Sequence, residues 1–357
     1  MPNKNDADAF LGKLSKTFGA DFVSKASKCP QINRISSGSL ELDIAMGGGF
    51  PTRRIILIYG PKSSAKSTIV SKACASSDRF CRVCKKDQMF CQCDKFSPGF
   101  GLYVDSEGTF IKSWAASLGT DLERLTVFTP ECGEHAVDAV DTAIREKLFN
   151  VIVVDSLAAC TPTHELEHST ETASMGQQAR MLNRAFRKWN GSMISAGKEA
   201  PILFCINQPR ESIGTMFGDS LTLPGGKGQW FFNSVELRLK TSKVHAAPGT
   251  TDNAYVEISG TVQKNKTYLP RQEFTFQLAL RDYDNVRKGE INNVDSIVKH
   301  GRKLGLIKAY KGVWTLDLPD LDIKIEANGK EELAFEIKKD VSAYEIMYDY
   351  ILKLALL

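Results

Sequence analysis

The chain has 357 residues, of which 42% are hydrophobic and 25% charged, and its formal net charge is +4. This is the composition of an ordinary globular protein, and its slight positive charge permits nucleic-acid binding without requiring it. No apolar run approaches a membrane span and no signal-peptide core begins the chain, which argues against a membrane or secreted protein and predicts a cytoplasmic one.

The predicted elements begin with a short amphipathic helix within residues 1–34, which we interpret as an oligomerisation helix and linker. Residues 35–280 alternate short apolar runs with helical stretches, the pattern of a mostly parallel sheet covered on both faces. The expected strands are Ile55–Tyr59, Gly101–Val104, Leu125–Phe128, Val151–Val154, Ile202–Ile206 and Val235–Leu239, with a closing antiparallel pair at Tyr255–Val262 and Glu273–Leu280. Residues 281–357 predict a small α/β domain that ends in a helix near Val341–Leu357. The fold class is therefore α/β.

The first apolar strand runs into a phosphate-binding loop and then a helix. Its residues are Gly60, Pro61, Lys62, Ser63, Ser64, Ala65, Lys66, Ser67 and Thr68. Backbone N–H groups would hold the phosphates, Lys66 would reach the β and γ phosphates, and Ser67 would ligate Mg²⁺. Ala65 stands where the motif has its second glycine, a mild fault if its φ is negative and a serious one if it is positive. The alternative is an ordinary serine-rich turn.

Two carboxylates at the ends of later strands suit the same site. Asp155 would hold Mg²⁺ through water, and Glu107 would polarise the attacking water. The alternatives are a helix cap for Asp155 and a solvated loop acid for Glu107.

Cysteines interrupt the core after the phosphate-loop helix, within residues 79–96. Cys81, Cys84, Cys91 and Cys93 have C-x2-C and C-x-C spacing and can close a tetrahedral site. The segment is otherwise polar, so a structural Zn²⁺ would supply its fold. The alternatives are four reduced thiols and, less favoured, an iron–sulfur cluster. The basic residues of this segment could contact DNA or a neighbouring protomer.

A glycine-rich loop follows the strand Ile202–Ile206. It carries the cation Arg210 and the apolar side chains Ile213, Met216 and Phe217. A loop that starts at the end of a parallel strand can contact a ligand there, and apolar side chains among glycines can lie against nucleotide bases. This loop therefore predicts a link between a phosphate switch and a polymer-binding surface.

These motifs together resemble the RecA family of recombinases. The markers are Ser36–Ala45, the phosphate loop, Val104–Glu107, Val153–Ser156, Met175–Lys188, Ile206–Gly226 and Lys264–Lys266. The resemblance implies a P-loop ATPase core for ATP-dependent homologous recombination and DNA repair. Such a protein forms helical filaments on single-stranded DNA, pairs it with homologous duplex and exchanges strands, with DNA-stimulated ATP hydrolysis.

The resemblance also assigns roles to single residues. It implies that ATP lies between protomers, that Glu107 is the catalytic carboxylate, and that Gln208 senses the γ-phosphate. Lys264 and Lys266 would reach the neighbour's ATP and stabilise transition-state charge. Trp114 would stack on adenine; a core aromatic is the equal alternative.

Two DNA-binding loops are implied, at roughly residues 161–175 and 208–226. Arg180, Arg187 and Arg210 would pair with phosphates without reading sequence. Met175, Ile213, Met216 and Phe217 would wedge against bases, with local packing as the alternative for Met175 and Phe217. The basic stretch 281–311 either collects duplex DNA or is a solvated face.

Several departures indicate a divergent member, for instance a phage-encoded one. Lys62 and Ala65 put the rate of hydrolysis in doubt, and the cysteine insertion is unlike bacterial members. A hexameric helicase or RadA-like branch-migration motor is the competing hypothesis, and a non-hydrolysing, ATP-gated single-strand binder is a third.

Overall fold

The computed structural model describes residues 4–19, 23–29, 31–77, 79–84, 88, 91–168, 176–211, 221–247, 249, 251–283, 286–318, 323–339 and 341–356. A nine-stranded sheet forms its centre, with the order β11-β12-β10-β3-β7-β6-β4-β5 and β13 paired with β12. The strands from β10 to β5 are parallel, whereas β11, β12 and β13 are joined by antiparallel pairs. The predicted α/β class with a mostly parallel sheet and a closing antiparallel pair is confirmed.

The strands of the central sheet keep close to the predicted ranges. They are β3 Ile55–Tyr59, β4 Phe100–Asp105, β5 Leu125–Phe128, β6 Phe149–Asp155, β7 Ile202–Asn207, β10 Val235–Leu239, β11 Lys243–Ala246, β12 Asn253–Asn265 and β13 Gln272–Ala279. Only β11 was not predicted from the sequence. It pairs at the outer edge of the antiparallel part, where its half-exposed residues give no apolar run to recognise.

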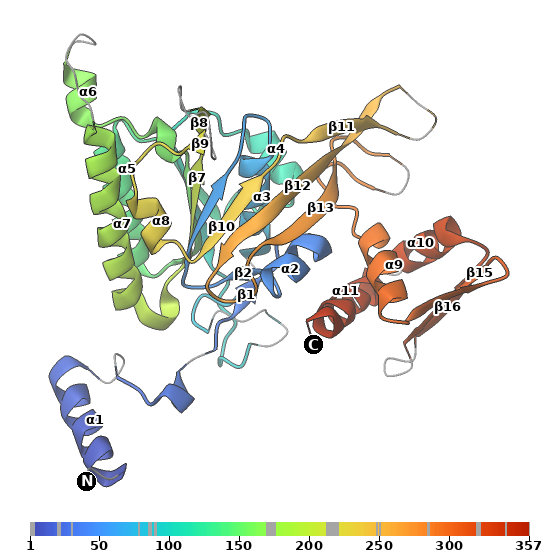
Figure 1. Ribbon diagram of the computed structural model, residues 1–357, viewed down its shortest axis with the longest axis horizontal. Coiled ribbons are helices and arrows are strands. Elements are labelled where there is room, and N and C mark those ends of the chain that lie inside the picture. Colours follow the sequence, from blue (N-terminus) through green and yellow to red (C-terminus); the bar gives the residue numbers. More distant parts are fainter. Residues whose placement is uncertain are drawn as a thin grey trace.

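Helices cover both faces of the sheet (Figure 1). They are α2 Leu40–Met46, α3 Lys66–Ser77, α4 Lys112–Ser117, α5 Gly133–Glu146, α6 Thr163–Glu167, α7 Gln177–Ala196 and α8 Gly228–Phe232. Alternate residues of β3 enter different cores: Ile56 and Ile58 pack with α2 and α3, whereas Ile55 and Leu57 pack with α5 and α7. Both faces of β3 are buried, which is why its first four residues are aliphatic and none of its residues is charged.

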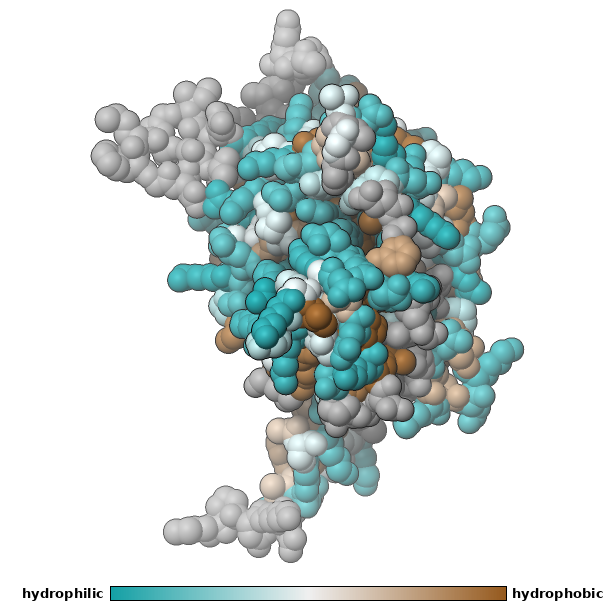
Figure 2. Space-filling view, turned by 90° about the vertical axis from the view of Figure 1, so that its right-hand side faces the viewer, coloured by the Kyte–Doolittle hydropathy of each residue, from teal (hydrophilic) through white to brown (hydrophobic). Residues whose placement is uncertain are grey.

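Two regions flank the sheet. Helix α1, Lys4–Phe18, stands apart from it in Figure 1 and exposes Phe10 and Phe18, while the short pair β1 Arg34–Ile35 and β2 Phe50–Pro51 joins that end of the chain to the core. The C-terminal elements enclose a third apolar core, which Leu40 also enters. They are α9 Val294–Lys303, β14 Ile307–Tyr310, β15 Val313–Leu318, β16 Ile323–Ala327, α10 Lys330–Lys339 and α11 Val341–Ala355. The side of the molecule on which they lie is mostly hydrophilic, with scattered apolar spots (Figure 2).

Among the described residues, no helix combines the length and the apolar character that crossing a bilayer requires.

Candidate nucleotide and DNA site

The loop between β3 and α3 lies at the carboxyl edge of the parallel strands. Lys66, the first residue of α3, curls back over this loop and donates to Gly60 O at 3.0 Å and Pro61 O at 2.7 Å. Burial lowers the pKa of the Lys66 ammonium, although Asp155 and Glu107 oppose that shift. An anion bound here would favour the charged form and compete with the two carbonyls, so the loop has the chemistry of a phosphate site.

The end of β6 faces the start of α3. The Ser67 hydroxyl donates to Asp155 Oδ2 at 2.6 Å, and Tyr103 of β4 donates to the same oxygen. Burial raises the pKa of the Asp155 carboxyl, and these two hydrogen bonds only partly offset it. A hydroxyl beside a buried carboxylate is an oxygen donor set that fits Mg²⁺, and a cation would favour the ionised carboxylate. The carboxylate accepts from side chains of α3 and β4, which favours the metal interpretation over the helix cap.

Glu107 follows β4 and approaches the end of β7. Its Oε1 accepts from Ser156 Oγ at 2.6 Å, next to Asp155. Glu107, Gln208 and Arg210 line one open cavity of about 240 Å³ together with Ala158 and Ala159. The fold thus brings Glu107 and Gln208, which are far apart in the sequence, to one space beside the phosphate loop.

The end of β7 is tied to the far side of the glycine-rich loop. Asn207 is buried and donates to Pro224 O at 2.9 Å and to Gln229 Oε1 at 2.8 Å. The strands β8 Arg210–Glu211 and β9 Leu221–Thr222 pair at the base of the same loop. Because Gln208 directly follows Asn207 and lies two residues before β8, a displacement of Gln208 would act on both ends of the loop.

Ala65 adopts the left-handed conformation, with φ at +64°. This is the costly case for the missing glycine, because a Cβ in that region clashes with the backbone by about 1–2 kcal/mol. The neighbouring Ser64 stabilises this conformation of the loop, because its side chain is buried and donates to Pro61 O at 2.8 Å.

Ala65→Gly is therefore expected to raise the free energy of unfolding by about 0.5–1 kcal/mol, since it removes the strain at some cost in chain entropy. Ala73→Gly is the matched control: Ala73 is buried inside α3, so the same exchange should destabilise the protein. Thermal unfolding of both variants checks the signs. A lower melting temperature for Ala65→Gly would contradict the assigned strain.

The predicted DNA-binding residues divide into two groups. Arg180 and Arg187 lie on α7 and Arg210 begins β8, and all three are exposed. Met175, Ile213, Met216 and Phe217 lie outside the described residues, so their DNA contacts stay predictions. The three cations lie toward the carboxyl edge of the sheet or on the helix that leads from it.

Lys264 and Lys266 lie away from this edge. Lys266 N–H bonds to Ser234 O, and Ser234 N–H bonds to Ile55 O, which places Lys266 level with the start of β3. The phosphate loop follows the other end of that strand, about 15 Å away at 3.3 Å per residue. Lys264 is held by Asn233 Oδ1 at 2.7 Å and by Glu236 at 3.3 Å. Neither lysine is beside the phosphate loop of its own chain.

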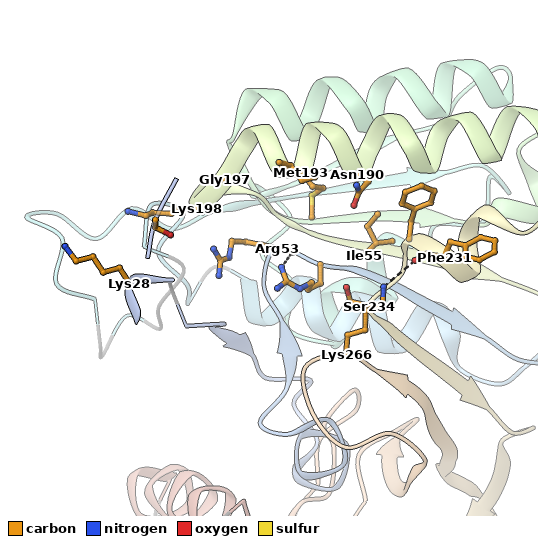
Figure 3. A pocket seen from close by; sticks show the side chains of 14 residues that line it. Lys28, Arg53, Ile55, Asn190, Met193, Gly197, Lys198, Phe231, Ser234 and Lys266 are labelled. Atoms are coloured by element: carbon orange, nitrogen blue, oxygen red, sulfur yellow. Dashed lines mark hydrogen bonds between the residues drawn. The ribbon is translucent and has the colours of Figure 1, made fainter. Parts of the chain in front are cut away.

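Lys266 opens onto a large basic groove (Figure 3). The groove has a volume of about 660 Å³. Its charged lining residues are all cations, namely Lys28, Arg53, Arg54, Lys198 and Lys266. Burial lowers the pKa of the Lys266 ammonium most, and the nearby charges of Lys264 and Arg54 lower it further. Such a groove would favour a bound anion.

Trp114 is half-buried on α4 and packs against the core on the α2–α3 face, with Lys288 Nζ 5.9 Å from its ring centroid. This is the packing expected of a core aromatic, and adenine stacking stays a prediction.

The four insertion cysteines converge. Their sulfur atoms all lie within 4.8 Å of one another, with Cys81–Cys93 at 3.9 Å and Cys84–Cys91 at 3.7 Å. A tetrahedral Zn–S₄ site with 2.3 Å bonds has sulfur atoms about 3.8 Å apart, so the cluster fits zinc. Burial opposes ionisation of Cys81, but backbone N–H groups of Cys84, Ser97 and Val83 outweigh it and lower its pKa to about 6. Of the other cysteines, Cys74, Cys132, Cys160 and Cys205 are buried and Cys29 is exposed.

Sequence reasoning missed the side chains that orient the carboxylates. Tyr103 and Ser156 bond to Asp155 and Glu107, and Gln229 bonds to Asn207. Ser156 directly follows Asp155, which was a usable signal. Tyr103 gave no such signal in the sequence, because an aromatic residue in a buried strand is ordinary.

A parallel sheet in which a strand runs through a loop into a helix, with carboxylates at the ends of neighbouring strands, is typical of the P-loop class of α/β proteins. The family model of the RecA N-terminal domain matches residues 6–283. Protein RecA of Kineococcus radiotolerans is 33% identical over 352 residues, covering 94% of both chains. Protein RecA of Mesomycoplasma hyopneumoniae is 34% identical over 307 residues, covering 85% of this chain and 82% of its own. The chain belongs to the RecA family of recombinases.

Proposed function

We propose that this protein is an ATP-dependent recombinase for homologous recombination and DNA repair. It assembles on single-stranded DNA as a helical filament in the cytoplasm, pairs that strand with homologous duplex and exchanges strands while it hydrolyses ATP. The observation that carries this proposal is the cavity shared by Glu107, Gln208 and Arg210. In the proposed roles these residues are a water-activating carboxylate, a phosphate sensor and a cation of the DNA loop, so nucleotide chemistry and DNA contact would share one space.

Within the site, each residue has a distinct task. Lys66 and the loop amides bind the ATP phosphates; Ser67, with Asp155 through water, would hold Mg²⁺, which would neutralise phosphate charge. Glu107 accepts a proton from water aligned with the γ-phosphate, and its bond from Ser156 fixes its orientation. Gln208 contacts the γ-phosphate and transmits its presence to β8 and the following loop.

The position of Lys266 supports a role between copies. Because it lies at the edge opposite to the phosphate loop, it can act on ATP only in a second copy whose carboxyl edge packs against the groove of Figure 3. The all-cationic lining of that groove fits a polyphosphate-bearing neighbour. Repeated in one direction, such a head-to-tail contact builds either a helix or a closed ring.

Electron microscopy of the protein with single-stranded DNA and ATP distinguishes these assemblies. Helical filaments are expected for the recombinase. Closed hexameric rings would favour a helicase or a RadA-like motor and overturn the proposal.

The basic stretch 281–311 is a weaker candidate for duplex DNA. Several of its cations are already engaged: Arg281 pairs with Asp252 at 3.0 Å, Lys299 pairs with Glu41 at 2.8 Å, and Arg302 lies 4.9 Å from the Trp314 ring. Its exposed remainder, including Lys308 and Lys311, is the part proposed to meet the duplex.

We also propose a structural zinc at the four cysteines. One zinc per chain is expected in purified protein by elemental analysis, and Cys84→Ser should lose it and lower the melting temperature, because a polar segment without metal cannot hold its fold. Cys74→Ser, at a buried cysteine outside the cluster, is the control that should keep zinc. Native protein free of metal, or an iron–sulfur absorbance, would contradict the zinc assignment.

A further inference from the structure

The cysteine knuckle, residues 79–84, 88 and 91–98, has a rigid base at the edge of the sheet opposite to the nucleotide site. Cys81 bridges to Pro98, two residues before β4 begins. Asn150 is buried beneath it and donates to Ser77 O at 2.9 Å and Phe80 O at 2.8 Å. The phosphate loop follows the carboxyl end of β3 and β8 follows the carboxyl end of β7, whereas the knuckle precedes the amino end of β4. The knuckle therefore does not belong to the nucleotide site.

The knuckle is bonded instead to the segment that leads to α1. Asn33 Nδ2 donates to the carbonyl oxygen of Cys84 at 3.0 Å. The Asn33 carbonyl in turn accepts from both Thr52 N–H, at 2.8 Å, and Thr52 Oγ1, at 3.0 Å. Asn33 therefore joins three parts of the molecule: the knuckle, the β1–β2 pair and the N-terminal arm, which we define as residues 4–19, 23–29 and 31–33.

The hydrogen bonds that hold the chain to the core differ on the two sides of Asn33. Arg34, the next residue, donates to Met46 O, Gly49 O and Thr267 O, each at 3.0 Å. On the other side of Asn33, a longer bond of 3.3 Å joins Arg53 to Gln31 O. Asn33 is thus held to the core by three hydrogen bonds and Gln31 by one longer bond, while Ser24 and Lys28 of the arm line the basic groove.

The arm carries an apolar surface that its own core does not cover. Phe10 is 60% exposed and Phe18 63% exposed on α1, and Lys25 of the linker pairs with Asp8 of the helix at 2.5 Å, an exposed ion pair that contributes little by itself. A change of direction at Asn33 would therefore act on the segment that leads to a helix with exposed aromatic residues.

We propose that Asn33 is a positioning residue through which the metal-bound knuckle sets the direction of the N-terminal arm, so that metal occupancy promotes self-assembly. This inference rests on the filament and the zinc proposed above. Cys84 supplies both a metal-ligating sulfur and the carbonyl that Asn33 binds. A metal that fixes the sulfur also fixes the orientation of the carbonyl of the same residue, whereas loss of the metal frees both. Another link from the knuckle, Arg79 to Glu345 at 3.9 Å, joins two largely exposed side chains and contributes little.

Asn33→Ala in the full-length protein separates the arm from the metal. It deletes the side-chain amide but keeps the backbone carbonyl that Thr52 binds. We expect full zinc content, faster hydrogen exchange in the peptides before Ile35, and about a threefold to tenfold higher protein concentration for half-assembly on single-stranded DNA with ATP, the change that follows loss of one ordinary hydrogen bond. Gln31→Ala is the matched control, because the Gln31 side chain is exposed and its bond from Arg53 uses the backbone.

Zinc chelation of both proteins provides the decisive comparison. In the wild type, chelation should accelerate exchange in the arm and weaken assembly; in Asn33→Ala it should add little to either. Equal effects of chelation in the two backgrounds would overturn the inference, as would wild-type exchange and assembly in Asn33→Ala. If the wild type bound DNA without forming filaments, the proposed function would fail, and the exchange data alone would decide whether the metal positions the arm.

Discussion

Lys66→Ala is expected to lower ATP affinity roughly 100-fold, or by about 3 kcal/mol, the value of a charge-assisted contact to phosphate. The ammonium lies over the loop within hydrogen-bonding distance of Gly60 O and Pro61 O, so it is already at the place where phosphates would bind. Because the proposed function couples DNA binding to bound ATP, ATP-dependent binding of single-stranded DNA should disappear as well. Nucleotide titration and DNA-binding anisotropy measure the two losses.

Lys62→Ala is the control for this experiment. Lys62 belongs to the same loop but is exposed, and its removal changes the local charge by the same amount. We expect less than about a threefold effect, as for an exposed charge. Unchanged nucleotide affinity in Lys66→Ala would refute the phosphate-loop assignment.

Gln208→Ala is expected to leave ATP binding nearly intact and to remove the gain in DNA affinity that ATP produces. Coupling between two sites is typically 1–3 kcal/mol, so the ATP-dependent enhancement should fall by roughly 5- to 150-fold. The physical reason is position: Gln208 shares a cavity with Glu107 and stands between buried Asn207 and the β8–β9 pair. Without its amide, the proposed contact between the phosphate and the start of the loop is lost.

The comparison needs DNA affinity with and without a slowly hydrolysed ATP analogue. Gln272→Ala on β13 is a suitable control, because its side chain bonds only locally, to Pro270 O at 3.3 Å. Full ATP-dependent affinity in Gln208→Ala would mean that the phosphate signal reaches the loop by another route.

Much of the core could be predicted because local patterns determine it. β3 is apolar on both faces and runs into a motif of fixed spacing, so strand, loop and helix follow from one stretch of sequence. Asp155 and Glu107 were found for a similar reason, since the carboxyl ends of parallel strands meet at one edge.

Other features depend on contacts that no local pattern reveals. The backbone conformation of Ala65 is fixed by the loop as a whole. From the sequence, only the cost of a negative or a positive φ at Ala65 could be predicted, not which of the two occurs. The bond from Asn33 to Cys84 joins residues 51 positions apart, and polar residues such as asparagine occur in any linker. Likewise, the basic groove gathers Lys28, Arg53, Lys198 and Lys266 from separate segments, none of which is unusually basic by itself.

The proposed function requires that this chain pair and exchange DNA strands under the control of ATP. A strand-exchange assay between a circular single strand and a homologous linear duplex tests it most directly. Joint molecules are expected with ATP and with a slowly hydrolysed analogue, and none are expected without nucleotide or with a heterologous duplex. Protein that binds the single strand with ATP yet forms no joint molecules, or forms them equally well without nucleotide, would contradict it.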